Sequence, residues 1–198
     1  MNNIMIDLET MGTGPSAAII AIGAVEFDEN SIGRKFYEVV TLESSVANGG
    51  VIDPSTVMWW LGQSEEARET IRVHGMHINV VLAKFSQWID YSDELQIWGN
   101  GAGFDNVILE TAYQRSGHEC PWKFFNNRCY RTVKALYPEV DAVRSGVHHN
   151  ALDDAITQAQ HMIAMRRALQ QLADSHRFNT TVLQPHKVHE IAFTAINP

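Results

Sequence analysis

The first forty residues show three apolar stretches separated by short polar breaks. The pattern predicts strands over residues 3–8, 17–28 and 35–42. A segment rich in Gly and Pro, residues 12–15, predicts a turn between the first two strands. Because the connections are short, we expect these strands to pair as antiparallel neighbours.

Beyond residue 50, apolar positions recur at helical spacing, and one short strand interrupts the helices. The expected elements are helices that open at 53–55 and after Ser64, a helix over 79–91, a strand over 95–99, and helices over 105–116, 129–137 and 151–173. This order predicts one α/β domain with a mixed sheet, residues 1–175, without an internal linker. The tail, residues 176–198, shows no clear periodicity and is expected to be an appendage that is either loose or dependent on a partner.

The composition narrows the class of protein. A chain of 198 residues that is 45% hydrophobic can bury a sizeable core. A net charge of -8 disfavours binding to long duplexes, so any contact with nucleic acid should be short and local. Cys120 and Cys129 fit neither a disulfide framework nor a common zinc motif. Without a signal peptide or a long apolar run, we expect a cytoplasmic protein that contacts no membrane.

Asp7 and Glu9 stand at the end of the first predicted strand. Residues two apart on a strand point to the same face, so the carboxylates should project together, roughly 6–7 Å apart. Their repulsion would raise one pKa unless a cation lay between them, and Mg²⁺ and Mn²⁺ prefer such oxygen ligands. The alternative is that the strand simply ends there and both acids are solvated.

Asp105 follows a glycine-rich segment, residues 99–103, and opens a predicted helix. An Asp at a helix N-terminus is most often a cap. A strand, a turn and an Asp in this order also bring a carboxylate to the end of a sheet, and the glycines would let a substrate backbone approach. The sequence leaves both roles open.

The last predicted helix begins beside a group of polar residues. Asn150 is a candidate N-cap, and Asp153 at the third position would complete a capping box. Asp154 lies about 100° further round the helix and is free to face a site. His149 precedes the cap, and a neutral histidine near a metal-bound water is a plausible general base. The alternative is a surface histidine beside acids at a helix start.

Together these segments resemble the motifs of the DEDDh branch of the DEDD 3′–5′ exonuclease superfamily. "DLET" resembles its first motif, "NGAGFD" its second and "HNALDDA" its third. The positions that carry the resemblance are Asp7, Glu9, Asp105, His149 and Asp154. The resemblance runs from about residue 3 to residue 170, and the paired tryptophans and small size look most like exoribonucleases near ribonuclease T.

The resemblance implies a ribonuclease H-like fold, a mixed β-sheet flanked by α-helices, and a mechanism with two ions of Mg²⁺ or Mn²⁺. Asp7 would bridge both ions, while Glu9 and Asp154 would complete the site of the attacking water. Asp105 would support the second ion, and His149 would position and deprotonate the water. The product would be a nucleoside 5′-monophosphate released from the 3′ end.

Aromatic and polar residues near the motifs are candidates for substrate binding. Thr10 and Met11 follow the first motif, where the family contacts the terminal nucleotide, although an apolar turn residue is as often packing. Trp59 and Trp60 diverge by about 100° on a helix, so we expect one in the core and the other against a base. Trp60 is taken here as the substrate-binding candidate. Phe104 would line the pocket for the terminal base or simply pack its helix.

Arg131 shares a three-residue spacing with Arg128 and Lys134 on a predicted helix. This row could face phosphates near Asp105. The alternative is a solvated helix face.

The leading hypothesis is a metal-dependent 3′–5′ exonuclease acting on single-stranded RNA or 3′ overhangs. The same chemistry on DNA, in repair or phage recombination, is the alternative, because no motif reports on the 2′-hydroxyl group. A catalytically silent nucleic-acid-binding module would be favoured by loss of a metal ligand, and none is lost. By the resemblance we also expect a homodimer, with residues 176–198 available for the contact.

Overall fold

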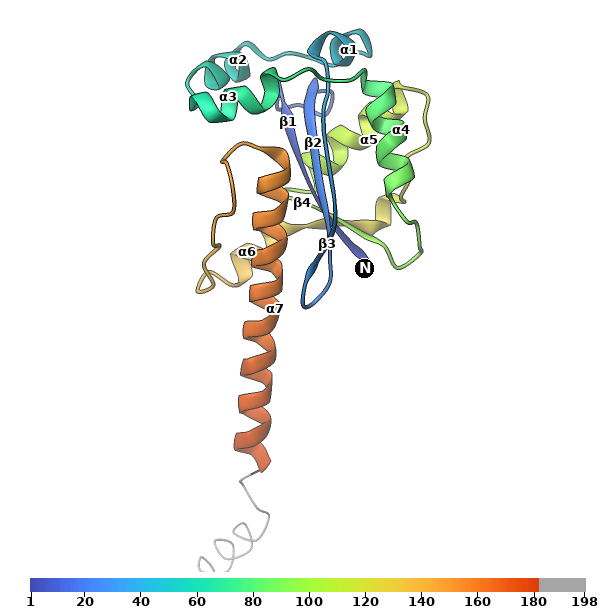
Figure 1. Ribbon diagram of the computed structural model, residues 1–198. Coiled ribbons are helices and arrows are strands. Elements are labelled where there is room, and N and C mark those ends of the chain that lie inside the picture. Colours follow the sequence, from blue (N-terminus) through green and yellow to red (C-terminus); the bar gives the residue numbers. More distant parts are fainter. Residues whose placement is uncertain (182–198) are drawn as a thin grey trace, which may run out of the picture.

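A five-stranded mixed sheet forms the centre of the protein in the computed structural model, which describes residues 1–181 (Figure 1). The strands are β1 (Asn3–Thr10), β2 (Ile19–Phe27), β3 (Ile32–Val39), β4 (Gln96–Gly99) and β5 (Asn127–Cys129), in the spatial order β3-β2-β1-β4-β5. The first three pair antiparallel, as predicted, whereas β1 pairs with β4 and β4 with β5 in parallel. The central position of β1 puts its C-terminal end between both halves of the sheet.

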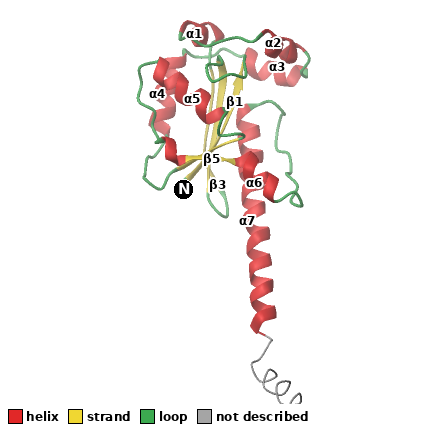
Figure 2. Cartoon of the chain, turned by 180° about the vertical axis from the view of Figure 1, so that it is seen from behind, coloured by secondary structure: helices red, strands yellow, loops and turns green. Residues whose placement is uncertain are grey.

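Helices cover both faces of the sheet and one of its ends (Figures 1 and 2). They are α1 (Leu42–Ala47), α2 (Pro54–Leu61), α3 (Glu65–Arg72), α4 (Ile78–Trp88), α5 (Asp105–Arg115), α6 (Tyr130–Leu136) and α7 (Ala151–Thr181). The pair α4 and α5 lies on one face and the pair α6 and α7 on the other, while α1, α2 and α3 lie at the end of the sheet to which β1 runs. Within the described residues, no helix combines the length and hydropathy of a membrane span.

The alternation of side chains along β1 builds both cores. Ile4, Ile6 and Leu8 point to one side and belong to a cluster with residues of α4 and α5. Met5 points to the other side and packs in a second cluster with residues of α7. Asp7 has the same parity as Met5, so the strand sends its acid toward α7.

Several boundaries differ from the sequence prediction. The third strand spans Ile32–Val39 rather than 35–42, because its pairing with β2 begins at the turn. The strand β5 was not predicted, and the helix after it begins at Tyr130. A three-residue strand has no periodicity of its own and is defined only by its pairing with β4. The short helix α1 was also not predicted.

The last helix is longer than predicted. It continues past residue 173 to Thr181, so the first six residues of the expected tail, 176–181, extend the helix. Residues 182–198, the rest of that tail, lie outside the described residues.

Candidate active site

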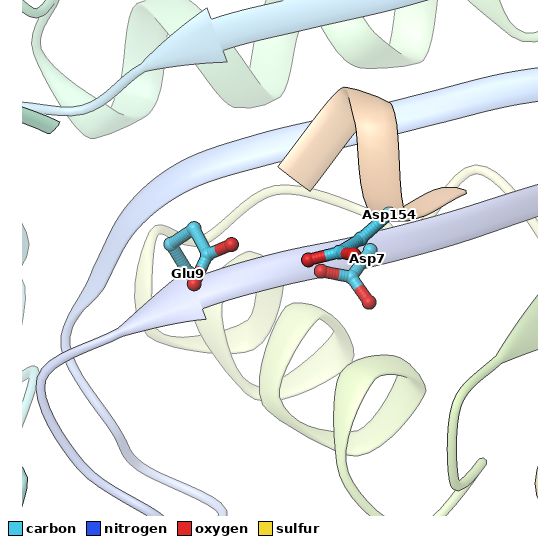
Figure 3. Close-up of side chains that lie close together, drawn as sticks. All are labelled: Asp7, Glu9 and Asp154. Carbon is cyan, nitrogen blue, oxygen red and sulfur yellow. The ribbon is translucent and has the colours of Figure 1, made fainter. Parts of the chain in front are cut away.

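Three carboxylates meet where the end of β1 faces the first turn of α7 (Figure 3). One oxygen each of Asp7, Glu9 and Asp154 lies within 4.8 Å of the other two. The first two come from alternate positions of β1, as the sequence predicts, and the third from the fourth position of α7. Gln158, one turn further along α7, donates from Nε2 to Oδ1 of Asp7 at 2.7 Å.

Asp105 approaches the same strand from the opposite helix layer. It is the first residue of α5, is only 2% exposed, and its Oδ1 accepts the backbone N–H of Leu8 at 3.2 Å. Phe104 occupies the N-cap position of this helix, so the ordinary capping role considered for Asp105 does not apply. The structure therefore places the fourth predicted acid beside β1, although it is outside the group of three.

The acids repel one another in a poorly solvated environment. Burial, followed by the charges of Asp105, Glu9 and Asp154, raises the pKa of Asp7 well above its ordinary value. Burial and the charges of Asp154 and Asp105 raise the pKa of Glu9 to about 8. Burial raises the pKa of Asp105 to about 7. Such shifts indicate that burial and mutual repulsion disfavour the charged forms of these acids more than nearby cations favour them.

The donor set fits a hard divalent cation. Oε1 of Glu9 and Oδ2 of Asp105 are buried and have no hydrogen-bond partner among the described residues. Buried polar atoms are rarely left unpaired, and carboxylate oxygens are the ligands that Mg²⁺ and Mn²⁺ prefer. The acids at the end of β1 are thus clustered and partly or fully buried rather than solvated chain ends, and their oxygens could hold such a cation.

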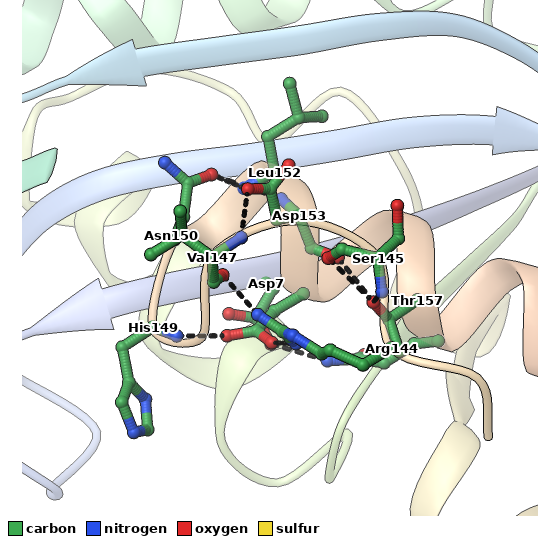
Figure 4. Close-up of polar contacts among 11 residues, drawn as sticks. Asp7, Arg144, Ser145, Val147, His149, Asn150, Leu152, Asp153 and Thr157 are labelled. Carbon is green, nitrogen blue, oxygen red and sulfur yellow. Dashed lines mark hydrogen bonds and ion pairs between the residues drawn. The ribbon is translucent and has the colours of Figure 1, made fainter. Parts of the chain in front are cut away.

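The segment before α7 is folded tightly onto the start of the helix (Figure 4). Asn150 caps α7 as predicted, because its Oδ1 accepts the N–H groups of Leu152 and Asp153 at 3.1 Å each. Asp153 does not complete the predicted capping box with Asn150. Its Oδ2 instead accepts the N–H of Val147 at 2.7 Å and so holds the preceding loop.

His149 adopts a left-handed backbone conformation, with φ 63°, at the turn into α7. Its N–H donates to Oδ2 of Asp154 at 3.1 Å, while its ring projects away from Asp7 in Figure 4. The ring packs edge to face against Trp59, with centroids 4.8 Å apart. Burial, then the neighbouring His148, lowers the pKa of His149, which favours the neutral imidazole.

A cleft of about 530 Å³ opens over the acids. Its walls include the predicted substrate residues Thr10, Trp60 and Phe104, and also Trp59 and His149. Side chains of β1, α2 and α7 thus enclose one space with the carboxylates on its surface. Its size and its mixture of apolar and polar groups suit a small ligand such as a nucleotide.

The two tryptophans divide as predicted, but Trp60 is the core residue. It is 4% exposed, and its Nε1 donates to the carbonyl of Thr10 at 2.9 Å. Trp59 is 44% exposed and faces the cleft beside His149. The exposed ring available for stacking is therefore Trp59, although Trp60 also lines the cleft.

Two other predicted substrate residues lie outside the cleft lining. Met11 packs against the small apolar cluster that contains Trp60 and does not line the cleft. This position agrees with the alternative that Met11 is a packing residue. Arg131 donates from Nη2 to the carbonyl of Asn100 at 2.8 Å, and Asn100 itself lines the cleft. Arg131 thus contacts a residue of the cleft lining but does not line the cleft itself.

Sequence comparison places the chain in a family. A family model described as the 3′–5′ exoribonuclease Rv2179c-like domain matches residues 2–166. The chain belongs to this family. A curated relative, an exodeoxyribonuclease of Enterobacteria phage T4, is 29% identical over 204 residues, which cover 85% of this chain and 89% of the relative. The protein is therefore a 3′–5′ exonuclease, and its predicted hydrolase class is confirmed.

Solved exonucleases share the fold. E. coli Exonuclease I in complex with a 5cy-dT13 oligonucleotide aligns with a TM-score of 0.63 and 17% identity, over 96% of this chain and 45% of that chain. The nuclease domain of 3′hExo, a DEDDh family member bound to rAMP, aligns with a TM-score of 0.58 and 16% identity, over 85% of this chain and 92% of that chain. S. pombe Pop2p in its Mg²⁺- and Mn²⁺-bound form aligns with a TM-score of 0.57 and 13% identity, over 83% of this chain and 82% of that chain. These likenesses confirm the ribonuclease H-like fold.

Two polar residues of this candidate site were missed by the sequence analysis. Gln158 follows Asp154 by one helical turn, and this spacing on one face of α7 could have revealed it. Arg144 pairs through Nη1 with Oδ1 of Asp154 and donates through Nη2 to the carbonyl of Val147. It lies in an irregular loop, where no periodicity indicates which residues meet.

Proposed function

We propose that this 3′–5′ exonuclease is metal-dependent and removes nucleoside 5′-monophosphates from single-stranded RNA or from 3′ overhangs. The observation that carries the proposal is the group of three carboxylates, with the buried unpartnered oxygens of Glu9 and Asp105, on the surface of an open cleft. Mutually repelling buried acids beside a cleft are the usual environment of a metal-dependent phosphodiesterase site.

Asp7, Glu9, Asp105 and Asp154 would hold two ions of Mg²⁺ or Mn²⁺. When bound, such ions supply Lewis-acid activation and compensate the charge that develops at the phosphate. The solved relative Pop2p, described as a Mg²⁺- and Mn²⁺-bound form, supports this choice of ions. Gln158 fixes the orientation of the Asp7 carboxylate by its 2.7 Å hydrogen bond and so prepares that ligand.

His149 is proposed as the general base. Its lowered pKa keeps a ring nitrogen available to accept the proton of the attacking water at neutral pH. The ring has to turn from Trp59 toward the acids for this step, and the left-handed turn at His149 places it at the rim of the cleft. Trp59, Trp60, Phe104 and Thr10 would form the surface against which the terminal nucleotide binds, with Met11 beneath that surface and Arg131 near the phosphates.

RNA is the favoured substrate because the matching family model describes an exoribonuclease. DNA is the second candidate, favoured by the phage T4 relative, which is an exodeoxyribonuclease and is matched over 89% of its length. The acids act on the phosphate, which both polymers share, so the choice depends on contacts to the sugar.

The test is a time course on matched 5′-labelled single-stranded RNA and DNA oligomers with Mn²⁺, Mg²⁺ or EDTA. We expect a ladder that shortens from the 3′ end, is blocked by EDTA and advances faster on RNA. Faster cleavage of DNA would transfer the proposal to the second candidate. Absence of cleavage of either polymer would favour the third hypothesis, a nucleic-acid-binding module.

We also propose a cytoplasmic homodimer in which residues 176–198, attached to the domain formed by residues 1–175, supply part of the contact. The long projection of α7 beyond the sheet in Figure 1 supports this, since it leaves the last turns of that helix, up to Thr181, away from the sheet. Light scattering of the full chain over a range of concentrations tests it. A monomer at every concentration would refute it.

A further inference from the structure

Arg144 brings a positive charge to the group of three carboxylates. Its side chain is 34% exposed, and Nη1 forms an ion pair with Oδ1 of Asp154, a member of the three-acid group. Among the side chains that the structure describes, it is the one Lys or Arg that pairs directly with an acid of this group. Arg131, the other nearby cation, instead bonds to a backbone carbonyl.

The same guanidinium holds the loop that carries His149. Nη2 of Arg144 donates to the carbonyl of Val147, two residues before His149 (Figure 4). The N–H of His149 then donates to Oδ2 of Asp154 at 3.1 Å. Both oxygens of Asp154 therefore accept hydrogen bonds from one loop, residues 144–149. Arg144 links Asp154 to this loop a second time through the carbonyl of Val147.

Further contacts make this loop a built feature rather than a chance surface arrangement. The Oγ1 of Thr157 accepts the N–H of Ser145 at 3.0 Å, and Oδ2 of Asp153 accepts the N–H of Val147. A Cβ on Gly146 would lie 2.2 Å from the Asp153 carboxyl group, so only glycine lets that carboxylate enter the loop. The loop is thus fitted around the first turn of α7, with Arg144 directed at the acids.

We propose that Arg144 is a positioning residue with two linked tasks: it is the internal counter-ion of Asp154 in the metal-free enzyme, and it fastens the loop that carries His149. The inference rests on the proposed metal-dependent function. A divalent cation and the guanidinium compete for Oδ1 of Asp154, so Arg144 weakens metal binding while keeping the site assembled. Removing its charge should tighten metal binding and, at the same time, slow the reaction.

The first measurement is a titration of the full chain with Mn²⁺, followed through the electron paramagnetic resonance signal of free Mn²⁺. Arg144→Gln should bind Mn²⁺ on the order of tenfold more tightly than wild type, the effect of one unit charge on a divalent ion across roughly 6 Å of water-like dielectric. Arg144→Lys keeps the charge and should bind Mn²⁺ as wild type does. Arg167→Gln is the matched control, because it removes the same charge at a position on α7 that lies about 20 Å along the helix from Asp154.

The second measurement is kcat at saturating Mn²⁺ with an oligonucleotide substrate. Both Arg144→Gln and Arg144→Lys should lower kcat roughly tenfold, because neither side chain reproduces the contact of the planar guanidinium with the carbonyl of Val147, which holds the His149 loop after the ion has taken Oδ1 of Asp154. The substrate KM should change little, since Arg144 is not among the residues that line the cleft. Arg167→Gln should leave both constants unchanged.

The outcomes separate the inference from the proposed function. If wild type binds no Mn²⁺, the metal-dependent function fails before Arg144 is considered. If wild type binds Mn²⁺ but Arg144→Gln binds it equally or more weakly, the counter-ion task is overturned. If Mn²⁺ binding tightens and kcat stays at the wild-type value, the fastening of the His149 loop is overturned. Arg144→Lys provides the kcat test if Arg144→Gln fails to fold, which circular dichroism shows.

Discussion

Gly23 of β2 and Ala151 of α7 meet backbone to backbone. A Cβ on Gly23 would lie 2.2 Å from the carbonyl carbon of Ala151 and 2.3 Å from the nitrogen of Leu152. Gly23 is also the partner of Asp7 in the β1–β2 ladder. The first turn of α7 can therefore rest directly on the strands beside Asp7, and this contact is what brings Asp154 to the other acids.

Replacing Gly23 with Ala should consequently damage both the fold and the site. The added methyl group forces α7 away from the sheet, and we expect a loss of about 1–3 kcal/mol in the free energy of unfolding. Mn²⁺ binding should weaken in parallel because Asp154 moves with the helix. Gly14→Ala is the matched control, since a Cβ at Gly14 meets nothing within 4 Å. Equal urea midpoints for Gly23→Ala and wild type would contradict this account.

Asp7→Asn and Asp154→Asn should each abolish hydrolysis while the chain stays folded. In the metal-free protein, Asp7→Asn should even raise the melting temperature, because it removes a buried carboxyl group that its neighbours repel. Nuclease assays with Mn²⁺ and thermal melts in EDTA measure the two effects. The exposed Asp174 provides the control substitution Asp174→Asn, which should change neither. Activity retained in both site variants would refute the assignment of the acids.

The stability of the metal-free protein should fall as pH rises toward 8. The pKa of Glu9 is about 8 in the folded protein against an ordinary value of 4.5. Between these values the folded state binds more protons than the unfolded state, so stability is fully present below about pH 4.5 and declines as pH rises through 8, by at most roughly 1.4 kcal/mol per pH unit. Asp105, with a pKa of about 7, acts in the same direction.

Urea unfolding in EDTA from pH 5 to 8 measures this decline. Glu9→Gln should flatten the profile, and saturating Mn²⁺ at pH 8 should restore stability by compensating the negative charges of the buried acids. Glu43→Gln, at an exposed position of α1, is the control and should follow wild type. A wild-type profile that rises from pH 5 to 8 would be inconsistent with the raised pKa values.

His149→Asn should lower the hydrolysis rate by roughly 10²- to 10⁴-fold, the usual contribution of a general base. Asn tolerates the left-handed backbone conformation found at this position, so the loop should keep its course. Mn²⁺ titration should give the same affinity as wild type, because the contact with Asp154 is made by the backbone N–H. Loss of Mn²⁺ binding in this variant would instead indicate a structural role.

Trp59 and Trp60 should respond differently to replacement by Ala. Trp60→Ala removes a buried ring and its bond to Thr10, so unfolding should become easier by about 3–5 kcal/mol. Trp59→Ala should leave stability nearly unchanged and raise the KM for an oligonucleotide roughly tenfold, since stacking on a base contributes about 1–3 kcal/mol. Trp59→Phe keeps an aromatic face and should restore most of the affinity. The reverse pattern would assign the stacking role to Trp60.

Local patterns were sufficient for the parts of the molecule that depend on neighbouring residues. The alternation along β1 sets Asp7 and Glu9 on one face, and the Asn150 cap fixes where α7 begins. The motifs around the acids and His149 resemble those of a 3′–5′ exonuclease family, and the family match over residues 2–166 confirms this recognition. The shared face of the two acids follows from strand periodicity and the helix start from a local cap, both of which a sequence displays directly.

Tertiary structure decided which residues from distant segments meet. The strand β5 exists only through its pairing with β4, which lies about 30 residues earlier in the chain. The burial of Trp60 rather than Trp59 depends on how α2 packs against the rest of the domain. The ion pair between Arg144 and Asp154 involves a loop of irregular backbone. The raised pKa of Glu9 likewise depends on burial and on the nearby charge of Asp154. Such contacts leave no periodic trace in the sequence, because they arise only when helices and loops pack against the sheet and exclude water from the acids between them.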